Sequence, residues 1–260
     1  MPDHVPYALR TAAAKGNLIA AVAGATLLAG IGATAAAPVD LSTWQADGTG
    51  GSWNLQSGNN AVLQTQNGPP TVFHSGTDSQ GLALSGTIRV QTTSDDDFVG
   101  FVLGYQQGEL TSASADYLLV DWKQGAQAGQ QAGLALSRIT GSLAATGSGT
   151  DSDAWQHTGV VSELARATTL GNTGWADHTT YNFDITFTAS LVRVAVNGLL
   201  ELEIFGSFTN GAFGFYNYSQ QSVLYAGIEE DEAIPEPAGI ALFGLGLLCL
   251  AARRRLSARI

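Results

Sequence analysis

The chain has 260 residues, enough for one sizeable domain with flanking segments or for two small domains. Its formal net charge is −11 and only 13% of its residues are charged, so glycine and uncharged polar residues must cover much of the surface. Such an acidic chain lacks the cationic face that phosphate binding requires, which excludes nucleic acid as an expected partner.

The first 37 residues have the pattern of a secretory signal peptide. Arg10 and Lys15 form a basic region, an apolar run covers residues 18–30, and small residues offer cleavage sites after Ala35 or Ala37. A proline directly after Ala37 favours the cut after Ala35. An uncleaved anchor helix is the alternative interpretation.

Residues 38–232 are predicted to form one all-β domain, a jelly-roll sandwich of many short strands separated by Gly, Asn, Asp and Ser. Residues 98–105 are apolar nearly throughout, which is typical of a strand covered on both faces. Residues 117–123 alternate, with Trp122 on one side of the strand and Asp121 on the other. The domain contains no cysteine, so its core must stabilise it without disulfides.

The clearest local unit is a β-hairpin. Two predicted strands, residues 191–196 and 199–205, flank the Asn197-Gly198 pair that a two-residue type I′ turn prefers. A helix is expected only near residues 160–168.

The last segment, residues 233–260, combines three features: the step Pro235-Glu236-Pro237, an uncharged run over 238–252, and the cluster Arg253, Arg254 and Arg255. As a helix the run would be roughly 22 Å long, shorter than the roughly 30 Å hydrocarbon core of a membrane. Positive flanks stay in the cytoplasm, so a transient inner-membrane insertion would leave the acidic domain outside. An ordinary tail anchor is the alternative.

This combination of a Pro-Glu-Pro step, a short apolar helix and a terminal arginine cluster resembles a PEP-CTERM sorting signal. The resemblance implies processing by an exosortase-type membrane enzyme near the motif. It also implies a secreted or cell-surface location in a Gram-negative bacterium, associated with extracellular polysaccharide and biofilm.

Residues 95–228 resemble the thrombospondin C-terminal domain, a concanavalin-type, lectin-like jelly-roll sandwich. The matching segments occur in the family's order and include DDDFVGFVLGYQ (95–106), YLLVDWKQ (117–124), GNTGWADHTTYNF (171–183) and GAFGFYNYSQQSVLYAGI (211–228). The resemblance implies a non-enzymatic adhesion module that binds calcium, with extracellular polysaccharide or a matrix protein as its partner. The long calcium-binding repeats of animal thrombospondins do not occur in this sequence.

The triplet Asp95, Asp96 and Asp97 precedes a predicted strand. Adjacent carboxylates repel one another unless a cation or water relieves them, and Ca²⁺ takes about six to eight oxygen ligands. The triplet is therefore the candidate calcium site, and Asp121 on a neighbouring predicted strand is a fourth candidate ligand. A solvated acidic loop is the alternative.

Four bulky aromatic residues are candidates for either core packing or sugar stacking: Trp122, Trp155, Trp175 and Tyr181. The core is favoured because large aromatic side chains dominate core burial. His74, His157 and His178 lack metal-site spacing, and the last two are expected to be hydrogen-bonded loop residues.

Glu201 and Glu203 permit a different interpretation, because some glycosidases use paired carboxylates. Strict alternation would place both on one exposed face, with Leu200, Leu202 and Ile204 facing the core. The glycosidase strand pattern Glu-x-Asp-x-x-Glu is not met. A binding protein is therefore expected rather than an enzyme, with a carbohydrate-active enzyme and a ligand-free structural matrix protein as alternatives.

Overall fold

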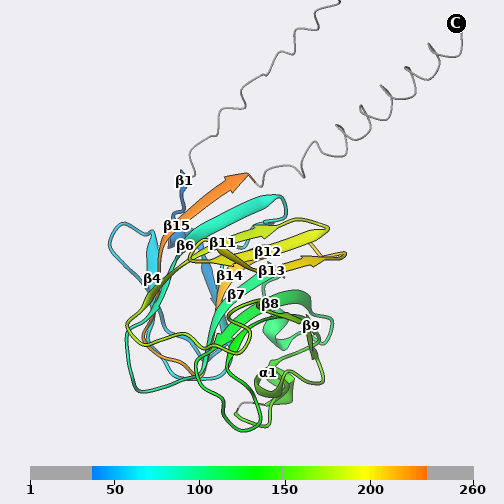
Figure 1. Ribbon diagram of the computed structural model, residues 1–260. Helices are drawn as coiled ribbons and strands as arrows, with labels where there is room; N and C mark the ends of the chain where they lie inside the picture. The colour runs from blue at the N-terminus through cyan, green and yellow to red at the C-terminus, as the bar shows by residue number, and fades with distance from the viewer. Residues whose placement is uncertain (1–36, 148, 233–260) are drawn as a thin grey trace, which may run out of the picture. The chain divides into compact units, whose positions relative to one another are not determined.

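The computed structural model describes residues 37–147 and 149–232, which form a two-layer antiparallel β-sandwich (Figure 1). The expected all-β fold is confirmed. Ala35, the Pro-Glu-Pro step and the arginine cluster lie outside the described residues. Among the helices within these two ranges, none has the length and apolar character needed to cross a membrane.

One layer is an eight-stranded sheet. Its strands run in the order β13 (Leu199–Phe205), β12 (Leu191–Val196), β11 (Thr180–Phe187), β6 (Leu82–Val90), β15 (Val223–Glu232), β4 (Ala61–Gln64) and β3 (Trp53–Leu55). The short strand β1 (Ala37–Pro38) also pairs with β15, where Ala37 lies opposite Glu230. The two ends of the described chain therefore lie at the same part of this sheet.

The other layer has seven strands. They run in the order β10 (Val161–Arg166), β9 (Gly133–Thr140), β8 (Asp116–Lys123), β7 (Phe98–Tyr105), β14 (Ala212–Tyr218), β5 (Thr71–His74) and β2 (Gln45–Asp47). The helix expected near residues 160–168 was wrong, because this segment is the edge strand β10 paired with β9. Backbone pairing with β9 makes this segment a strand despite the local helical pattern, although its residues 162–164 are exposed.

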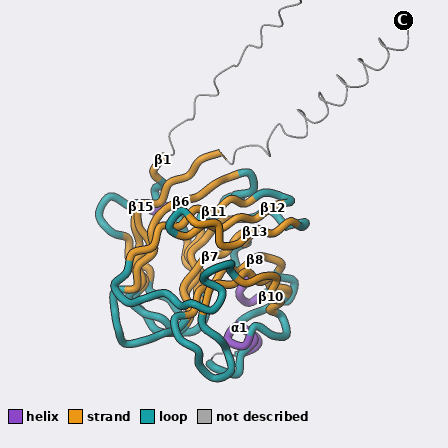
Figure 2. Tube along the Cα trace, in the orientation of Figure 1, coloured by secondary structure: helices purple, strands orange, loops and turns teal. Residues whose placement is uncertain are grey.

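Helical structure is short. The 3₁₀ turns are Leu41–Thr43, Glu109–Thr111 and Ala144–Thr146, and the α-helix α1 is Asp153–Gln156. Figure 2 shows α1 on the side of the seven-stranded sheet that faces away from β6, β11 and β12.

The inner strands β7, β8 and β14 of the seven-stranded sheet are buried on both faces, as the apolar run in β7 predicts. Val99, Phe101 and Leu103 point into the core between the two sheets. Phe98 and Val102 point the other way, into a second core. Two connecting segments, residues 106–115 and the described residues of 141–147 and 149–160, contribute side chains such as Leu110, Leu143 and Trp155 to this second core. Together they form the cover of the sheet's outer face.

The hairpin between β12 and β13 is confirmed. Asn197 and Gly198 have φ angles of 51° and 76°, the left-handed values that a type I′ turn requires. The register then shifts: Leu200 lies opposite Ala195 and Leu202 opposite Val194, so a β-bulge leaves Glu201 without a partner.

Candidate functional site

An acidic loop leads from β6 into β7. Asp95, Asp96 and Asp97 directly precede Phe98, the first residue of β7. One carboxylate oxygen from each aspartate lies within 4.8 Å of the others. Asp97 is buried, whereas Asp95 and Asp96 are half-buried. The structure therefore brings the three predicted carboxylates together at the end of a core strand.

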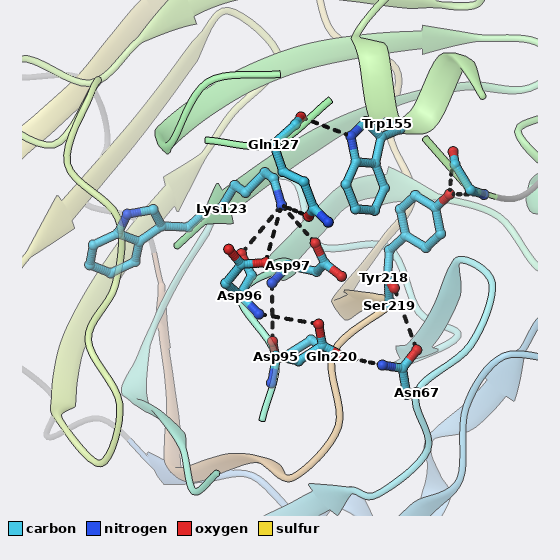
Figure 3. Close-up of polar contacts among 12 residues, drawn as sticks. Asn67, Asp95, Asp96, Asp97, Lys123, Gln127, Trp155, Tyr218, Ser219 and Gln220 are labelled. Carbon is cyan, nitrogen blue, oxygen red and sulfur yellow. Dashed lines mark hydrogen bonds and ion pairs between the residues drawn. The ribbon is translucent and has the colours of Figure 1, made fainter. Parts of the chain in front are cut away.

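Lys123 of β8 reaches into this loop, because the register places it opposite Phe98 (Figure 3). Its Nζ lies 2.6 Å from Asp97 Oδ1 and 3.9 Å from Asp96 Oδ1. The ammonium group also lies 4.9 Å from the ring centroid of Phe98 and 4.4 Å from that of Trp155. Since the Lys123 side chain is only 1% exposed, the acidic loop contains a built-in, desolvated counter-ion.

Neighbouring loops hold the acidic loop in position. Gln220 Oε1 accepts a hydrogen bond of 3.1 Å from the backbone N–H of Asp97, and the Asn67 side chain donates to the Asp95 carboxylate. Trp175 Nε1 also donates to the backbone oxygen of Asp97 at 3.1 Å. Figure 3 shows Asn67 and Gln220 converging on the triplet from separate segments.

The turn that carries Gln220 is conformationally strained. Ser219 and Ser222 have φ angles of 55° and 59°, values that non-glycine residues adopt only infrequently. The fully buried Gln64 fixes this turn by donating from Nε2 to the backbone oxygen of Gln220 at 2.9 Å. Backbone strain of this kind concentrates at functional sites, where the surrounding structure enforces it.

Burial and neighbouring carboxylates change the acidity of Asp95. Burial raises the pKa of Asp95 to about 6, and the charges of Asp97 and Asp96 act in the same direction. Asp95 therefore retains a proton over a pH range in which an ordinary aspartate is ionised.

The donor set fits a hard divalent cation. Carboxylate oxygens at this mutual spacing are the ligands that Ca²⁺ prefers. One oxygen of Asp97 binds Lys123, which leaves its second oxygen and the carboxylates of Asp95 and Asp96 to hold a cation.

Asp121, the fourth candidate ligand, faces a different partner. It lies on β8 and is 1% exposed, with Oδ2 placed 2.9 Å from His157 Nε2. Its other oxygen, Oδ1, has no hydrogen-bond partner within the described residues. Asp121 is not one of the carboxylates that cluster in the acidic loop.

His157 joins the cover to the sheet, and it is a hydrogen-bonded loop residue, as expected. It follows α1 as the C-cap with φ 49°, and its Nδ1 lies 3.3 Å from Glu163 Oε2. Burial by itself would lower the pKa of His157, but the charge and hydrogen bond of Asp121, reinforced by Glu163, raise it to about 10. The protonated imidazole thus bridges two carboxylates.

The candidate aromatic residues lie in the two cores. Trp122, Trp155 and Trp175 are at most 4% exposed, and Tyr181 packs against Trp122 with ring centroids 4.7 Å apart. Tyr181 also uses its hydroxyl to accept a hydrogen bond from the backbone N–H of Ala176. This placement supports the core interpretation over a sugar-stacking surface.

The expectation that Glu201 and Glu203 share an exposed face was wrong. The bulge shifts the alternation, so Glu201 is 2% exposed while Leu200 is 50% exposed. The Glu201 carboxylate accepts hydrogen bonds from the backbone N–H groups of Thr169 and Leu170. Glu203 instead pairs with Arg193 on the surface at 2.5 Å. Neither arrangement resembles a facing pair of free carboxylates.

Sequence reasoning missed Lys123 and Gln220. A signal for Lys123 was present, because a lysine in a strand covered on both faces must find a buried partner. Gln220 carried no comparable signal, since its role depends on how the loop between β14 and β15 meets the acidic loop.

The sequence matches known protein families over most of its length. The family model described as the thrombospondin C-terminal region matches residues 49–231, and the PEP-CTERM protein-sorting motif matches residues 233–255. Human thrombospondin-3 is 27% identical over 209 residues, and human cartilage oligomeric matrix protein is 26% identical over 207 residues. Each alignment covers 71% of this chain, but only 21% and 26% of the two relatives. The chain thus spans about a quarter or less of their length.

Solved structures show the same fold at low sequence identity. A Bacillus subtilis protein with a galectin-like fold has a TM-score of 0.54 at 10% identity, covering 76% of this chain and 95% of that structure. The carbohydrate-binding module CBM66 from Bacillus subtilis has a TM-score of 0.51 at 9% identity, covering 73% and 95%. The lectin-like sandwich is thereby confirmed, and the sequence match assigns its lineage: the chain belongs to the thrombospondin C-terminal region family and carries a PEP-CTERM sorting motif.

Proposed function

We propose that this chain is an exported bacterial surface or matrix protein whose sandwich binds extracellular polysaccharide or another matrix protein and holds Ca²⁺ on its acidic loop. The observation that carries the proposal is the convergence of Asp95, Asp96 and Asp97 within a thrombospondin C-terminal domain. Bound Ca²⁺ would supply a fixed positive charge and coordination positions at the loop. The chain's own residues position the carboxylates and limit their repulsion.

The sorting motif supports the location. Its match to residues 233–255 is the basis for proposing an exosortase-type processing enzyme as a transient partner and the cell surface or exterior as the destination. The pairing of Ala37 with Glu230 supports signal cleavage after Ala35, because a cut after Ala37 would remove part of strand β1.

Binding is proposed rather than catalysis. Glu201 accepts a hydrogen bond from the backbone N–H of Thr169, and Glu203 forms an ion pair with Arg193. The two carboxylates considered for glycosidase chemistry are therefore not available as a free acid and base.

Calcium binding is tested on the full-length chain by titration calorimetry and thermal denaturation. We expect heat of binding and a higher melting temperature with Ca²⁺, and loss of both effects in Asp96→Ala. Asp184→Ala, which removes an exposed carboxylate from β11, serves as the matched control. No heat and no shift for the unsubstituted chain would remove calcium from the proposal.

Sorting is tested by mass spectrometry of the secreted protein from an exosortase-containing host. A mature chain that lacks Arg253–Arg255 is expected. A secreted chain that still carries these arginines would rule out exosortase processing. Adhesion is tested separately, by retention of the protein on a polysaccharide matrix before and after chelation of Ca²⁺.

A further inference from the structure

A polar hollow lies on the outer face of the seven-stranded sheet, beyond Tyr105 at the end of β7. It has a volume of about 120 Å³. The acidic loop lies at the other end of β7, a distance of roughly 25 Å by strand rise. The hollow is therefore separate from the candidate calcium site.

His74 forms part of the floor and is held in one neutral form. The backbone N–H of Gly76 donates to His74 Nδ1 at 3.1 Å, so the proton resides on Nε2, which donates to Gln107 Oε1 at 2.7 Å. His74 is 1% exposed, and its ring packs against Tyr105 with centroids 5.2 Å apart. A rigid, uncharged floor results, with the loops that carry Gly76 and Gln107 as walls.

Exposed side chains at the rim retain unused hydrogen-bonding capacity. The Gln45 amide, the Asp78 carboxylate and the Gln107 amide nitrogen all border the hollow. All three side chains are exposed, and among the hydrogen bonds of the described residues only Gln107 Oε1 takes part, in its bond to His74. Two amide groups and one carboxylate provide donors and acceptors, a combination that complements neighbouring hydroxyl groups. The Gln107 amide is held in place by its bond to His74.

The charge of the hollow restricts the ligand. Asp78 is on the rim, and Asp47 lies behind the floor, where it accepts a hydrogen bond of 2.5 Å from the Tyr105 hydroxyl. Among the residues that the structure describes, no lysine or arginine lines the hollow. An anionic ligand would meet like charge without a compensating cation.

We infer that this hollow binds the hydroxyl edge of a neutral sugar unit, with Gln45, Asp78 and Gln107 as its hydrogen-bonding groups. The hollow is smaller than the about 300–1,000 Å³ of pockets that enclose drug-sized ligands, so it takes part of one ring and leaves the rest of a polysaccharide outside. This inference rests on the proposed function and deepens it, because it names the class of sugar and the place on the domain where the polysaccharide binds.

The test uses the full-length chain with neutral oligosaccharides ending in glucose, galactose or mannose, and with polygalacturonate as the anionic probe. We expect binding to at least one neutral probe and none to polygalacturonate. Gln45→Ala should weaken neutral-sugar binding about fivefold and Asp78→Ala about tenfold, because each removes one ligand hydrogen bond from an exposed side chain. Asp184→Ala on the other sheet should leave the affinity unchanged.

Two results would overturn the inference: sugar binding that is unaffected by Gln45→Ala and Asp78→Ala, or tighter binding to polygalacturonate than to every neutral probe. Unchanged melting temperatures in the two variants show that the comparison concerns binding. Calcium titration of the same preparations separates failure of the sugar site from failure of the calcium site. Calcium binding at the acidic loop should be lost in Asp96→Ala and unchanged in Asp78→Ala.

Discussion

Lys123 at the end of β8 and Asp97 in the acidic loop directly before β7 form a buried ion pair, with Nζ 2.6 Å from Oδ1 and side chains only 1% and 5% exposed. Three consecutive carboxylates would repel one another in a loop of this kind. The ammonium group offsets part of that repulsion from within the protein, and Trp155 packs over it. The acidic loop therefore has a counter-ion that does not depend on calcium.

Replacing Lys123 with methionine should destabilise the protein strongly. Removing one partner of a buried pair leaves an uncompensated charge, which costs about 3 kcal/mol or more in free energy of unfolding. Urea denaturation without calcium measures the effect. Arg193→Met is the control, because its exposed pair with Glu203 contributes at most about 1 kcal/mol. Equal losses in the two variants would contradict a special role for Lys123.

The same pair predicts a calcium-dependent rescue. In Lys123→Met, Asp97 gains a free oxygen, so added Ca²⁺ should raise the free energy of unfolding more than it does in the unsubstituted chain. The double variant Lys123→Met with Asp97→Asn should recover stability in the absence of calcium, because it removes the isolated charge. A calcium effect of the same size in all three proteins would show that Lys123 and the metal act independently.

Asp95 should make the metal-free protein less stable as the pH rises. Its folded-state pKa, raised to about 6, lies above the unfolded value near 4. The contribution of this group is therefore fully present below pH 4 and is lost as the pH rises through 6. Subtracting the denaturation profile of Asp95→Asn from that of the unsubstituted chain isolates the effect. A flat difference between pH 4 and 7 would mean that Asp95 titrates normally.

His157 should impose a second, alkaline dependence. Its folded-state pKa of about 10 exceeds the unfolded value near 6.5, so the stability it contributes is complete below pH 6.5 and is lost as the pH rises through 10. Chemical denaturation of the unsubstituted chain and of His157→Gln across pH 6 to 10.5 measures this loss. The two curves should converge at the alkaline end, and parallel curves would argue against a charged pair with Asp121.

Glu201 and Glu203 should differ in their effect on stability although they are two residues apart. Glu201→Ala leaves the N–H groups of Thr169 and Leu170 without their acceptor and should cost about 2 kcal/mol. Glu203→Ala removes an exposed ion pair and should cost less than about 1 kcal/mol. Thermal denaturation of both variants checks this. A larger loss of stability for Glu203→Ala than for Glu201→Ala would contradict the placement of Glu201 as the buried residue and Glu203 as the exposed one.

Local patterns were sufficient where one physical factor dominates. The apolar run of β7 predicted a strand buried on both faces, and Asn197-Gly198 predicted a tight hairpin, because these residues tolerate left-handed backbone angles. The alternation in β8 correctly placed Asp121 and Trp122 on opposite faces of the sheet. Trp122 lies in the core between the two sheets. These features depend on neighbours within a few residues.

Patterns failed where a distant contact changed the outcome. Residues 160–168 have a helical pattern, but pairing with β9 makes most of them a strand. The bulge at Glu201 is invisible to alternation, because the register of β12 against β13 produces it. Asp121 was a candidate fourth calcium ligand because its predicted strand neighbours the triplet, and the structure pairs it with His157 from the cover.

The sequence by itself determined the all-β class, the acidic and disulfide-free character of the domain, the sorting motif, and the three adjacent carboxylates, since composition and short motifs are properties of the chain before it folds. Only the tertiary structure decided which charges meet. Lys123 approaches Asp97, Gln220 supports the acidic loop, and Gln45 borders the same hollow as Asp78 because strands far apart in the sequence lie side by side in the sheets. Charge pairing inside a protein depends on such distances and on burial, which no linear pattern contains.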